Sequence, residues 1–289
     1  MVEIREDDIN ALIASLHEKD DAVKIYTLGI IADNSKREQA IDEVISFLSY
    51  PNENVRAQAA KTLGKIGSRK AIDSLVISLH DSAEEVRLNA ITALGRIEAY
   101  QAIPFIEPSL KDYSSKVRNE AALILDFLGW NPETLEGELL FYIARFKWEE
   151  IIELEKVDED LLLQFLYDED CEVVKGVAET LGRMKVEKAI QPLFDLFMSA
   201  DNKDLQVSLS QAIALIGGEK ALDLLLVAST DENWFIRKCA VDALGEMKDL
   251  LALNPLFDMM KDDNLYVRKS VMKAIQKIRD SVRRNVPEN

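Results

Sequence analysis

The chain has 289 residues, of which 48% are hydrophobic and 30% are charged, a composition that excludes both a disordered polypeptide and a membrane protein. Its net charge of −17 argues against binding to a nucleic-acid backbone or to an anionic membrane surface, because both attract basic proteins. The small numbers of glycines (11) and prolines (7) favour long helices, which tolerate little of either residue.

The N-terminal residues and the cysteines indicate where the protein resides. Residues 1–8 contain neither a basic leader nor an apolar core, so we expect no signal peptide there. No stretch of about 18 apolar residues predicts a transmembrane helix. Cys171 and Cys239 lie far apart and form no CxxC pair, which is typical of reduced thiols rather than of a disulfide framework or a metal cluster. We therefore expect a cytoplasmic protein.

The sequence contains internal repeat units, and the first of them begins near residue 6. The first unit, residues 6–36, is the least regular and carries Val23-Lys24. Three units then align without gaps, at residues 39–66, 70–97 and 101–128, and each opens with Ala-Ile. A Val-Arg pair recurs in them at steps of 31 residues, at Val55-Arg56, Val86-Arg87 and Val117-Arg118.

Each unit is predicted to form two helices. In residues 70–97, two apolar stripes with helical spacing are separated by Asp81-Ser82, which can cap the second helix. A glycine recurs near the end of that second helix, and its cost of about 1 kcal/mol relative to alanine indicates close packing of backbones. The stripes consist of Ile72, Leu75, Val76 and Leu79, then of Val86, Ala90, Leu94 and Ile97; the recurring glycines are Gly64, Gly95, Gly182 and Gly245.

An acidic segment interrupts the repeats, which then resume. Residues 131–172 contain fourteen acidic and three basic side chains, whereas residues 251–289 contain five acidic and eight basic ones. Two degenerate copies follow the interruption, and two regular units complete the chain with Ile236-Arg237 and Val267-Arg268, giving about eight units. One helix pair cannot bury its apolar stripe alone, whereas stacked pairs can.

We therefore predict an all-α protein, a right-handed α-α superhelix of about eight helical hairpins. It would form one continuous solenoid with an N-terminal repeat block at residues 1–130, an acidic helical insert at 131–160 and a C-terminal repeat block at 161–289.

In four of the Val-Arg and Ile-Arg pairs an aspartate lies five residues before the valine or isoleucine. We expect the arginine of one unit to bond with the aspartate of its neighbour, which would make a ladder along the stack. The alternative is that these arginines bind a ligand, but a pair that recurs with the repeat favours the structural role. The predicted ladder comprises Arg56, Arg87, Arg118, Arg237 and Arg268 with Asp81, Asp112, Asp231 and Asp262.

The pattern of Ala71-Ile72, Asp81, Val86-Arg87, Ala90 and Ala93-Leu94-Gly95 resembles the HEAT-like repeats of the phycobilisome-lyase type. The resemblance implies the fold but leaves the function open, because relatives include chromophore lyases, a metal-dependent hydroxylase, DNA glycosylases and scaffold proteins. The segment with Leu128 to Glu133, Leu140 to Ala144 and Lys147 to Glu150 resembles an insert of uncharacterised, often archaeal, HEAT-like proteins.

The sequence gives little support to catalysis. The hydroxylase relatives bind two irons through several His-Glu pairs, but only His17-Glu18 matches here and His80 precedes an aspartate. There is no phosphate-binding glycine loop and no nucleophile elbow. We therefore expect no metal, no cofactor and no catalytic residue. A lyase-like role in attaching a chromophore is the alternative that the resemblance leaves open.

We instead expect a scaffold, adaptor or assembly factor that binds a protein partner along its concave groove and is itself a monomer. Leu123 and Phe127 are apolar where equivalent positions of other units are polar, so they could begin an aromatic, acid-rimmed contact patch. The alternative is that helices of the insert cover them as local core, and Trp234 and Tyr266 could equally pack between adjacent turns. The candidate contact residues are Leu123, Phe127, Trp130, Tyr142, Trp148, Glu149, Glu150, Trp234 and Tyr266.

Overall fold

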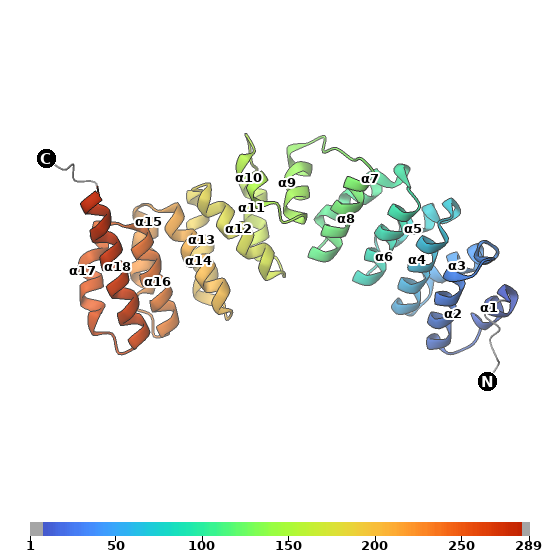
Figure 1. The fold of residues 1–289 in the computed structure, drawn as a ribbon, viewed down its shortest axis with the longest axis horizontal. Helices are drawn as coiled ribbons and strands as arrows, with labels where there is room; N and C mark the ends of the chain where they lie inside the picture. Colours follow the sequence, from blue (N-terminus) through green and yellow to red (C-terminus); the bar gives the residue numbers. More distant parts are fainter. Residues whose placement is uncertain (1–7, 285–289) are drawn as a thin grey trace. The chain divides into compact units, whose positions relative to one another are not determined.

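A computed structural model describes residues 8–284, and in this range the chain forms helices and turns without any strand (Figure 1). The prediction of an all-α HEAT-like fold is therefore confirmed. Residues 1–7, on which most of the signal-peptide prediction rests, lie outside the described part. No helix between residues 8 and 284 combines the length and the apolar character that crossing a membrane would require.

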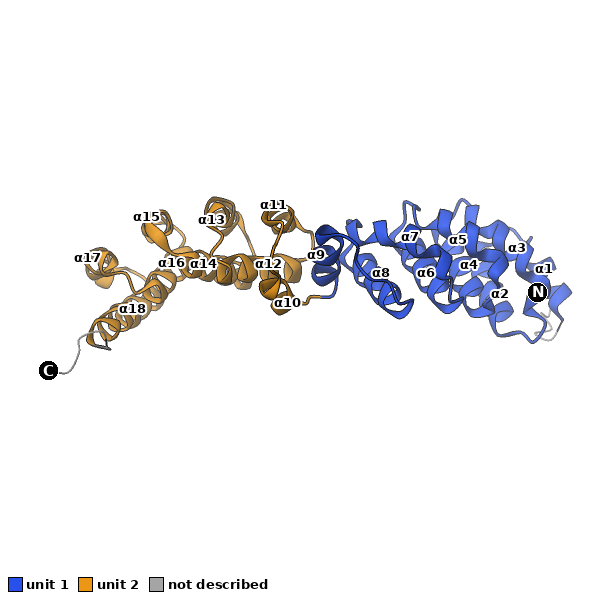
Figure 2. Cartoon of the chain, turned by 90° about the horizontal axis from the view of Figure 1, so that it is seen from above, with its two compact units in different colours: residues 1–145 blue, residues 146–289 orange. Residues whose placement is uncertain are grey.

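The chain forms two compact units, residues 1–145 and residues 146–289 (Figure 2). The boundary between them falls inside the segment 131–160 that we assigned to an insert. In both units the helices form two rows, so that each pair contributes one helix to each row. We call the row made by the second helix of each pair the second-helix row. In unit 1 it comprises α2 (Asp21–Asp33), α4 (Glu53–Ile66), α6 (Glu84–Arg96) and α8 (Ser115–Phe127), and in unit 2 it comprises α12 (Cys171–Arg183), α14 (Lys203–Ile216), α16 (Trp234–Met247) and α18 (Leu265–Arg284).

From residue 8 onward, unit 1 contains four helix pairs and a further helix. Several first helices are short because they continue as 3₁₀ turns before the chain reverses. The helices are α1 (Ile9–Ser15), α2 (Asp21–Asp33), α3 (Ile41–Ser46), α4 (Glu53–Ile66), α5 (Ile72–Ser78), α6 (Glu84–Arg96), α7 (Ile103–Ile106), α8 (Ser115–Phe127) and α9 (Leu135–Ala144).

Unit 2 begins with a short additional helix and continues with four pairs. Its last helix is the longest in the described part of the chain. The helices are α10 (Trp148–Glu153), α11 (Glu159–Gln164), α12 (Cys171–Arg183), α13 (Ile190–Ser199), α14 (Lys203–Ile216), α15 (Gly218–Ala228), α16 (Trp234–Met247), α17 (Leu253–Asp258) and α18 (Leu265–Arg284).

Polar caps mark where most of the second helices begin, although α6 follows Ala83 without a side-chain cap. Asn52 is extended and its side-chain oxygen accepts the N–H of Asn54, which satisfies one of the free donors at the start of α4. Asn233 does the same for α16 by accepting the N–H of Phe235. The same position is a capping residue in α2, α8, α12 and α14, namely Asp20, Ser114, Asp170 and Asn202.

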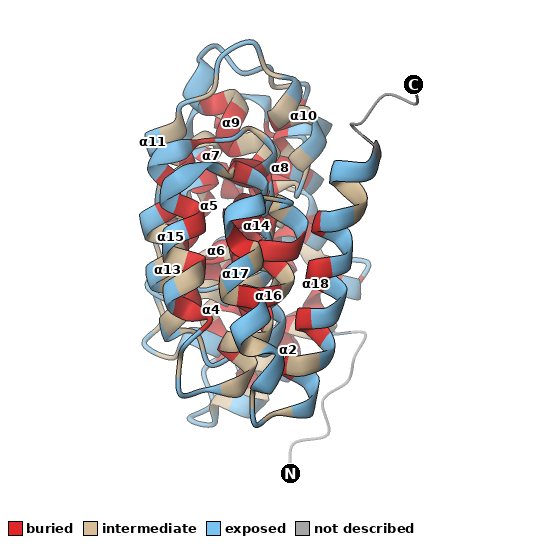
Figure 3. Ribbon diagram, turned by 90° about the vertical axis from the view of Figure 1, so that its left-hand side faces the viewer, coloured by how far each residue is buried: buried red, intermediate tan, exposed pale blue. Residues whose placement is uncertain are grey.

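The core lies between the two rows and between successive pairs, where the leucine, isoleucine, valine and alanine stripes meet (Figure 3). One leucine of each regular second helix is fully buried, because its helical spacing keeps it on the covered face. Every pair thus shares its core with its neighbours, as a solenoid requires. These leucines include Leu63, Leu94, Leu125, Leu181 and Leu244.

Glycine allows second helices to approach one another closely. A Cβ atom at Gly64 would lie 2.8 Å from the Cα of Ala93, and one at Gly245 would lie 2.8 Å from the Cα of Ala274. Non-bonded carbon atoms normally stay about 3.5–4.0 Å apart, so no larger residue fits without movement of the next helix. The recurrence of glycine in the sequence therefore corresponds to contact of helix backbones inside each unit.

Candidate functional site

Along the second-helix row of unit 1, the exposed side chains change from polar on α4 and α6 to apolar on α8. Lys65 of α4 pairs with Asp33 at 3.2 Å, and the hydroxyl of Thr92 on α6 donates to Glu120 at 2.6 Å. On α8 the side chains that follow are apolar: Leu123 is 40% exposed and Phe127 is 64% exposed. Large apolar side chains gathered on one surface mark a possible contact site, whereas isolated ones do not. Leu123 and Phe127 lie one helical turn apart on the same face, so they form a pair.

Trp130 and Tyr142 are engaged with unit 1 itself. The Trp130 and Phe141 rings lie 5.7 Å apart, and Tyr142 packs edge-on against Phe141 at 6.0 Å. The side-chain amide of Asn119 on α8 donates to the carbonyl of Ala144 at 2.8 Å and ties the end of α9 to α8. Trp130 and Tyr142 are therefore half-buried packing residues, and they are less accessible to a partner than Phe127.

Trp148 packs onto α12 at the start of unit 2. A Cβ atom at Gly176 would lie 2.1 Å from the indole, so the absence of a side chain there creates the space that the ring occupies. Glu149 accepts two hydrogen bonds from Arg183, at 2.5 and 2.7 Å, and these bonds hold the pKa of Glu149 below its ordinary value despite the opposing effect of burial. Glu150 lies 3.5 Å from Lys147.

A shallow pocket of about 430 Å³ adjoins Trp148 on the second-helix row of unit 2. Its wall combines the apolar faces of Trp148 and Leu215 with charged side chains of α12, so it resembles a polar-rimmed contact surface more than an enclosed substrate pocket. The remaining lining residues include Glu172, Lys175, Glu179 and Gln211.

Trp234 and Tyr266 belong to neighbouring pairs of unit 2 and contact each other. Their rings lie 5.6 Å apart, and Trp234 also meets Phe235 edge-on at 5.5 Å. The ammonium group of Lys203 lies 5.7 Å from the Trp234 ring and 5.3 Å from the Phe235 ring, within the range of a cation–π interaction. These side chains therefore link the starts of three successive second helices, α14, α16 and α18, although Tyr266 remains largely exposed.

Arginines and aspartates of neighbouring pairs form bidentate bonds. Nε and Nη2 of Arg87 donate to the carboxylate of Asp112 at 2.6 and 2.8 Å. Its Nη1 donates to the carbonyls of Asp81 and Ser82 in its own loop, so one guanidinium holds two loops together. Two further pairs, Arg56 with Asp81 and Arg237 with Asp262, have the same geometry. This fixed fork is specific to arginine.

Models of HEAT repeats match residues 9–86, 72–137 and 192–276, which together exceed half of the chain. The chain belongs to the HEAT repeat family. No curated protein matches its sequence.

Several solved structures are similar to this HEAT repeat chain. Human deoxyhypusine hydroxylase is 20% identical, with 95% of this chain and 97% of that chain covered and a TM-score of 0.39. Kap95p, in a complex with RanGDP, is 16% identical, with 94% and 39% covered and a TM-score of 0.45. The CpcE–CpcF complex of phycocyanin lyase from a Nostoc species is 19% identical, with 82% and 94% covered and a TM-score of 0.31.

Other HEAT units of this chain vary the arginine–aspartate contact. In the first unit Lys24 takes the arginine position, bonds to the carbonyl of Glu18, and lies 5.6 Å from the ring of Tyr50, which takes the aspartate position. In α14 Gln206 replaces the arginine and donates to the carbonyl of Ala200 at 2.8 Å. The other residues of the predicted ladder make bonds within their own loops. Arg118 donates to the carbonyls of Asp112 and Tyr113, and Arg268 donates to those of Asp262 and Asp263. Asp231 accepts the N–H of Asn233.

The stability of unit 2 should depend on pH through Asp262. The hydrogen bond from Arg237 holds the pKa of Asp262 below its ordinary value of 3.8, although burial opposes this effect. A carboxylate whose folded pKa is depressed adds stability above its unfolded pKa, and this contribution disappears as the pH falls through the folded pKa. We expect the urea midpoint of Asp262→Asn to lie below that of the wild type at neutral pH and to fall less steeply below about pH 4.

The pair of Asp42 and Lys70 provides the control for this pH experiment, because both of its side chains are largely exposed. Asp42→Asn should leave the decrease of the urea midpoint at acid pH unchanged, since an exposed ion pair adds little to the free energy of unfolding. If the urea midpoints of the wild type and of Asp262→Asn fell equally steeply as the pH is lowered below about 4, the role assigned to Asp262 would be contradicted.

In the described part of this HEAT structure, the side chains that could bind a metal ion or act as a nucleophile do not gather at one site. Between residues 8 and 284, no three His, Cys, Asp or Glu side chains are placed so that they could hold a metal ion together. His17 lies 3.3 Å from Glu43. Cys239 is buried, and burial raises the pKa of its thiol to about 11, so the reactive thiolate is scarce at neutral pH.

Proposed function

We propose that this HEAT repeat protein is a non-catalytic scaffold that binds a protein partner along its second-helix row. The observation that carries the proposal is the exposed apolar pair of Leu123 and Phe127, at positions where α4 and α6 present Lys61, Lys65 and Arg96. Large apolar side chains with polar surroundings suit the centre of a protein contact.

The charge of the chain is compatible with this role. With a net charge of −17, the protein would repel nucleic acid and favour a partner with a basic surface around its apolar contact residues. We propose in addition that the protein is a cytoplasmic monomer and that its second-helix row binds a protein rather than a small substrate.

The proposal is tested by purifying the full chain from its native host after cross-linking and quantifying the bound proteins by mass spectrometry. Phe127→Glu should reduce the recovery of a stoichiometric partner about ten-fold or more, because a buried charge at a contact centre costs well over 1.4 kcal/mol. Ile77→Glu is the matched control, because Ile77 is a 74% exposed apolar residue on the first helix of a pair in the same unit.

Circular dichroism should show that both variants melt as the wild type does, since both side chains are exposed. Equal recovery of the partner with Phe127→Glu and with the wild type would exclude the proposed surface. A pigment that co-purifies and absorbs visible light would instead support the alternative, a phycobilin-lyase-like role in chromophore attachment.

A further inference from the structure

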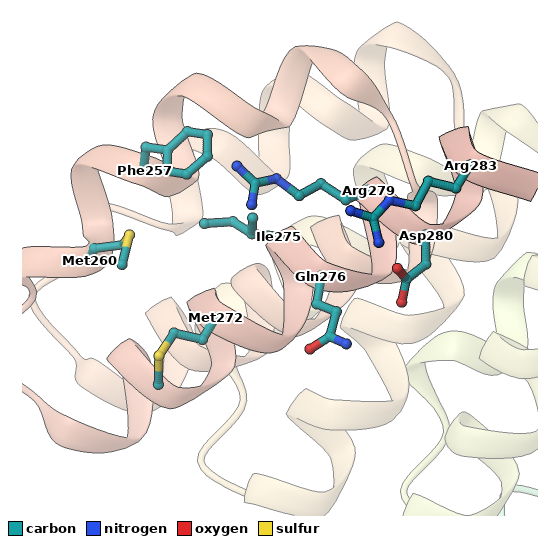
Figure 4. A pocket seen from close by; sticks show the side chains of 8 residues that line it. All are labelled: Phe257, Met260, Met272, Ile275, Gln276, Arg279, Asp280 and Arg283. Atoms are coloured by element: carbon teal, nitrogen blue, oxygen red, sulfur yellow. The ribbon is translucent and has the colours of Figure 1, made fainter.

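Among the described residues of unit 2, the pair α17 and α18 borders an open groove. Its floor is formed by Phe257 of α17, by Met260 in the 3₁₀ turn that follows α17, and by Met272 and Ile275 of α18 (Figure 4). Met260 and Met272 are 45% and 54% exposed, and the groove encloses about 360 Å³. At the equivalent positions of the preceding pair, Val241 and Leu244 of α16 are buried, whereas Met272 of α18 is exposed.

The groove is unsuited to another HEAT pair stacked in the usual way. In α4, α6, α12 and α16 the close-contact position near the end of the helix is glycine, but in α18 it is Gln276, which is exposed. A following second helix that approached as α18 approaches Gly245 would meet the Gln276 side chain. An element that lies between α17 and α18 avoids this contact, whereas a regular next unit would not.

Basic side chains form the rim of the groove. Arg279 and Arg283 project from α18, and the Arg279 guanidinium lies 5.3 Å from the Phe257 ring. Among the described side chains that line the groove, Asp280 is the one acidic residue. The segment 251–289 has eight basic and five acidic residues in a chain whose net charge is −17, so a positive rim is a local exception. Such a rim selects an acidic partner.

We propose that this groove binds a single amphipathic helix of a partner protein, with apolar side chains on the methionine floor and acidic side chains at Arg279 and Arg283. The lining residues of α18 run from Met272 to Arg283, about 16 Å at 1.5 Å per residue, so a helix of about three turns fits. Flexible methionines adapt to different apolar side chains, and helices commonly bind in such grooves. The site is separate from Leu123 and Phe127 and does not depend on the function proposed for them.

The test is a selection from a phage library of helical peptides against the full-length protein. The library fixes leucine or phenylalanine at positions i, i+3, i+4 and i+7 and randomises the flanks. We expect selected flanks to contain at least about twice as many acidic as basic residues. The selected peptides should bind Met272→Glu about ten-fold or more weakly than the wild type in fluorescence anisotropy. Arg279→Glu with Arg283→Glu should reverse the preference toward basic flanks.

Val227→Glu is the matched control, because Val227 of α15 is also a largely exposed apolar residue of unit 2 but does not line the groove. It should bind the selected peptides as the wild type does. The proposal is overturned by flanks without acidic enrichment, by equal binding to Met272→Glu, or by equal weakening in Val227→Glu. It is also overturned if sedimentation shows that a second copy of the chain occupies the groove and Met272→Glu abolishes this self-association.

Discussion

Replacing Arg87 with alanine should lower the free energy of unfolding by about 3–5 kcal/mol, because the substitution leaves the charge of Asp112 buried without its partner. Arg87 is 4% exposed and makes two bonds to Asp112 and two to the carbonyls of Asp81 and Ser82. The carbonyls of Asp81 and Ser82 would also lose this donor, which adds to the cost. Urea titration followed by circular dichroism measures the change.

Two variants show whether geometry or charge carries this effect. Arg87→Lys keeps the charge but cannot supply the planar fork that reaches both loops, so it should recover only part of the loss. Lys70→Ala breaks the exposed pair with Asp42 and should cost less than about 1 kcal/mol. Similar losses in Lys70→Ala and Arg87→Ala would show that Arg87 acts only as a surface charge.

The repeat itself made the pairing of neighbouring loops predictable. A step of 31 residues places Asp112 in the unit after Arg87, and stacking brings equivalent loops together, so sequence spacing alone indicates the partner. The substitutions inside the ladder were harder to predict, because Lys24 reaches a ring and Gln206 reaches a carbonyl rather than a carboxylate. Such contacts depend on side-chain length and not on the period.

Contacts outside the repeat could not be derived from it. Trp148 packs on Gly176 because that glycine removes a side chain where the indole lies, and no equivalent contact elsewhere in the sequence indicates this pairing. The exposure of Phe127 was also open, because the sequence does not specify whether the helices after α8 cover it. The sequence grouped Trp130, Tyr142 and Trp148 by type and proximity, whereas the structure separates packed rings from exposed ones.

The close-contact position carries a signal that the sequence could have provided. It is glycine in α4, α6, α12 and α16 and alanine, Ala32 and Ala214, in α2 and α14. It is polar and exposed in α8 and α18, where Asp126 and Gln276 occupy it. A small residue is required where a second helix packs closely against the position, and a polar one is tolerated where none does. The position therefore indicates where regular stacking within a unit ends.

Gly64→Ala should destabilise unit 1 by about 1–3 kcal/mol, because the added methyl group would lie 2.8 Å from the Cα of Ala93 and force α4 and α6 apart. Helix propensity alone predicts the opposite sign, since alanine is favoured over glycine inside a helix by about 1 kcal/mol. The sign of the change in the urea midpoint therefore distinguishes close helix packing from local helix preference.

Gly29→Ala is the matched control in the same row of helices. A Cβ atom there would meet only the end of the flexible Gln58 side chain, at 3.8 Å, which is an ordinary contact. This substitution should leave stability unchanged or raise it by up to about 1 kcal/mol, as helix propensity predicts. If Gly64→Ala were also stabilising, α4 and α6 could separate at little cost, and the recurring glycine would have no role in packing. Opposite signs for the two substitutions would instead show that the second helices are held at backbone contact.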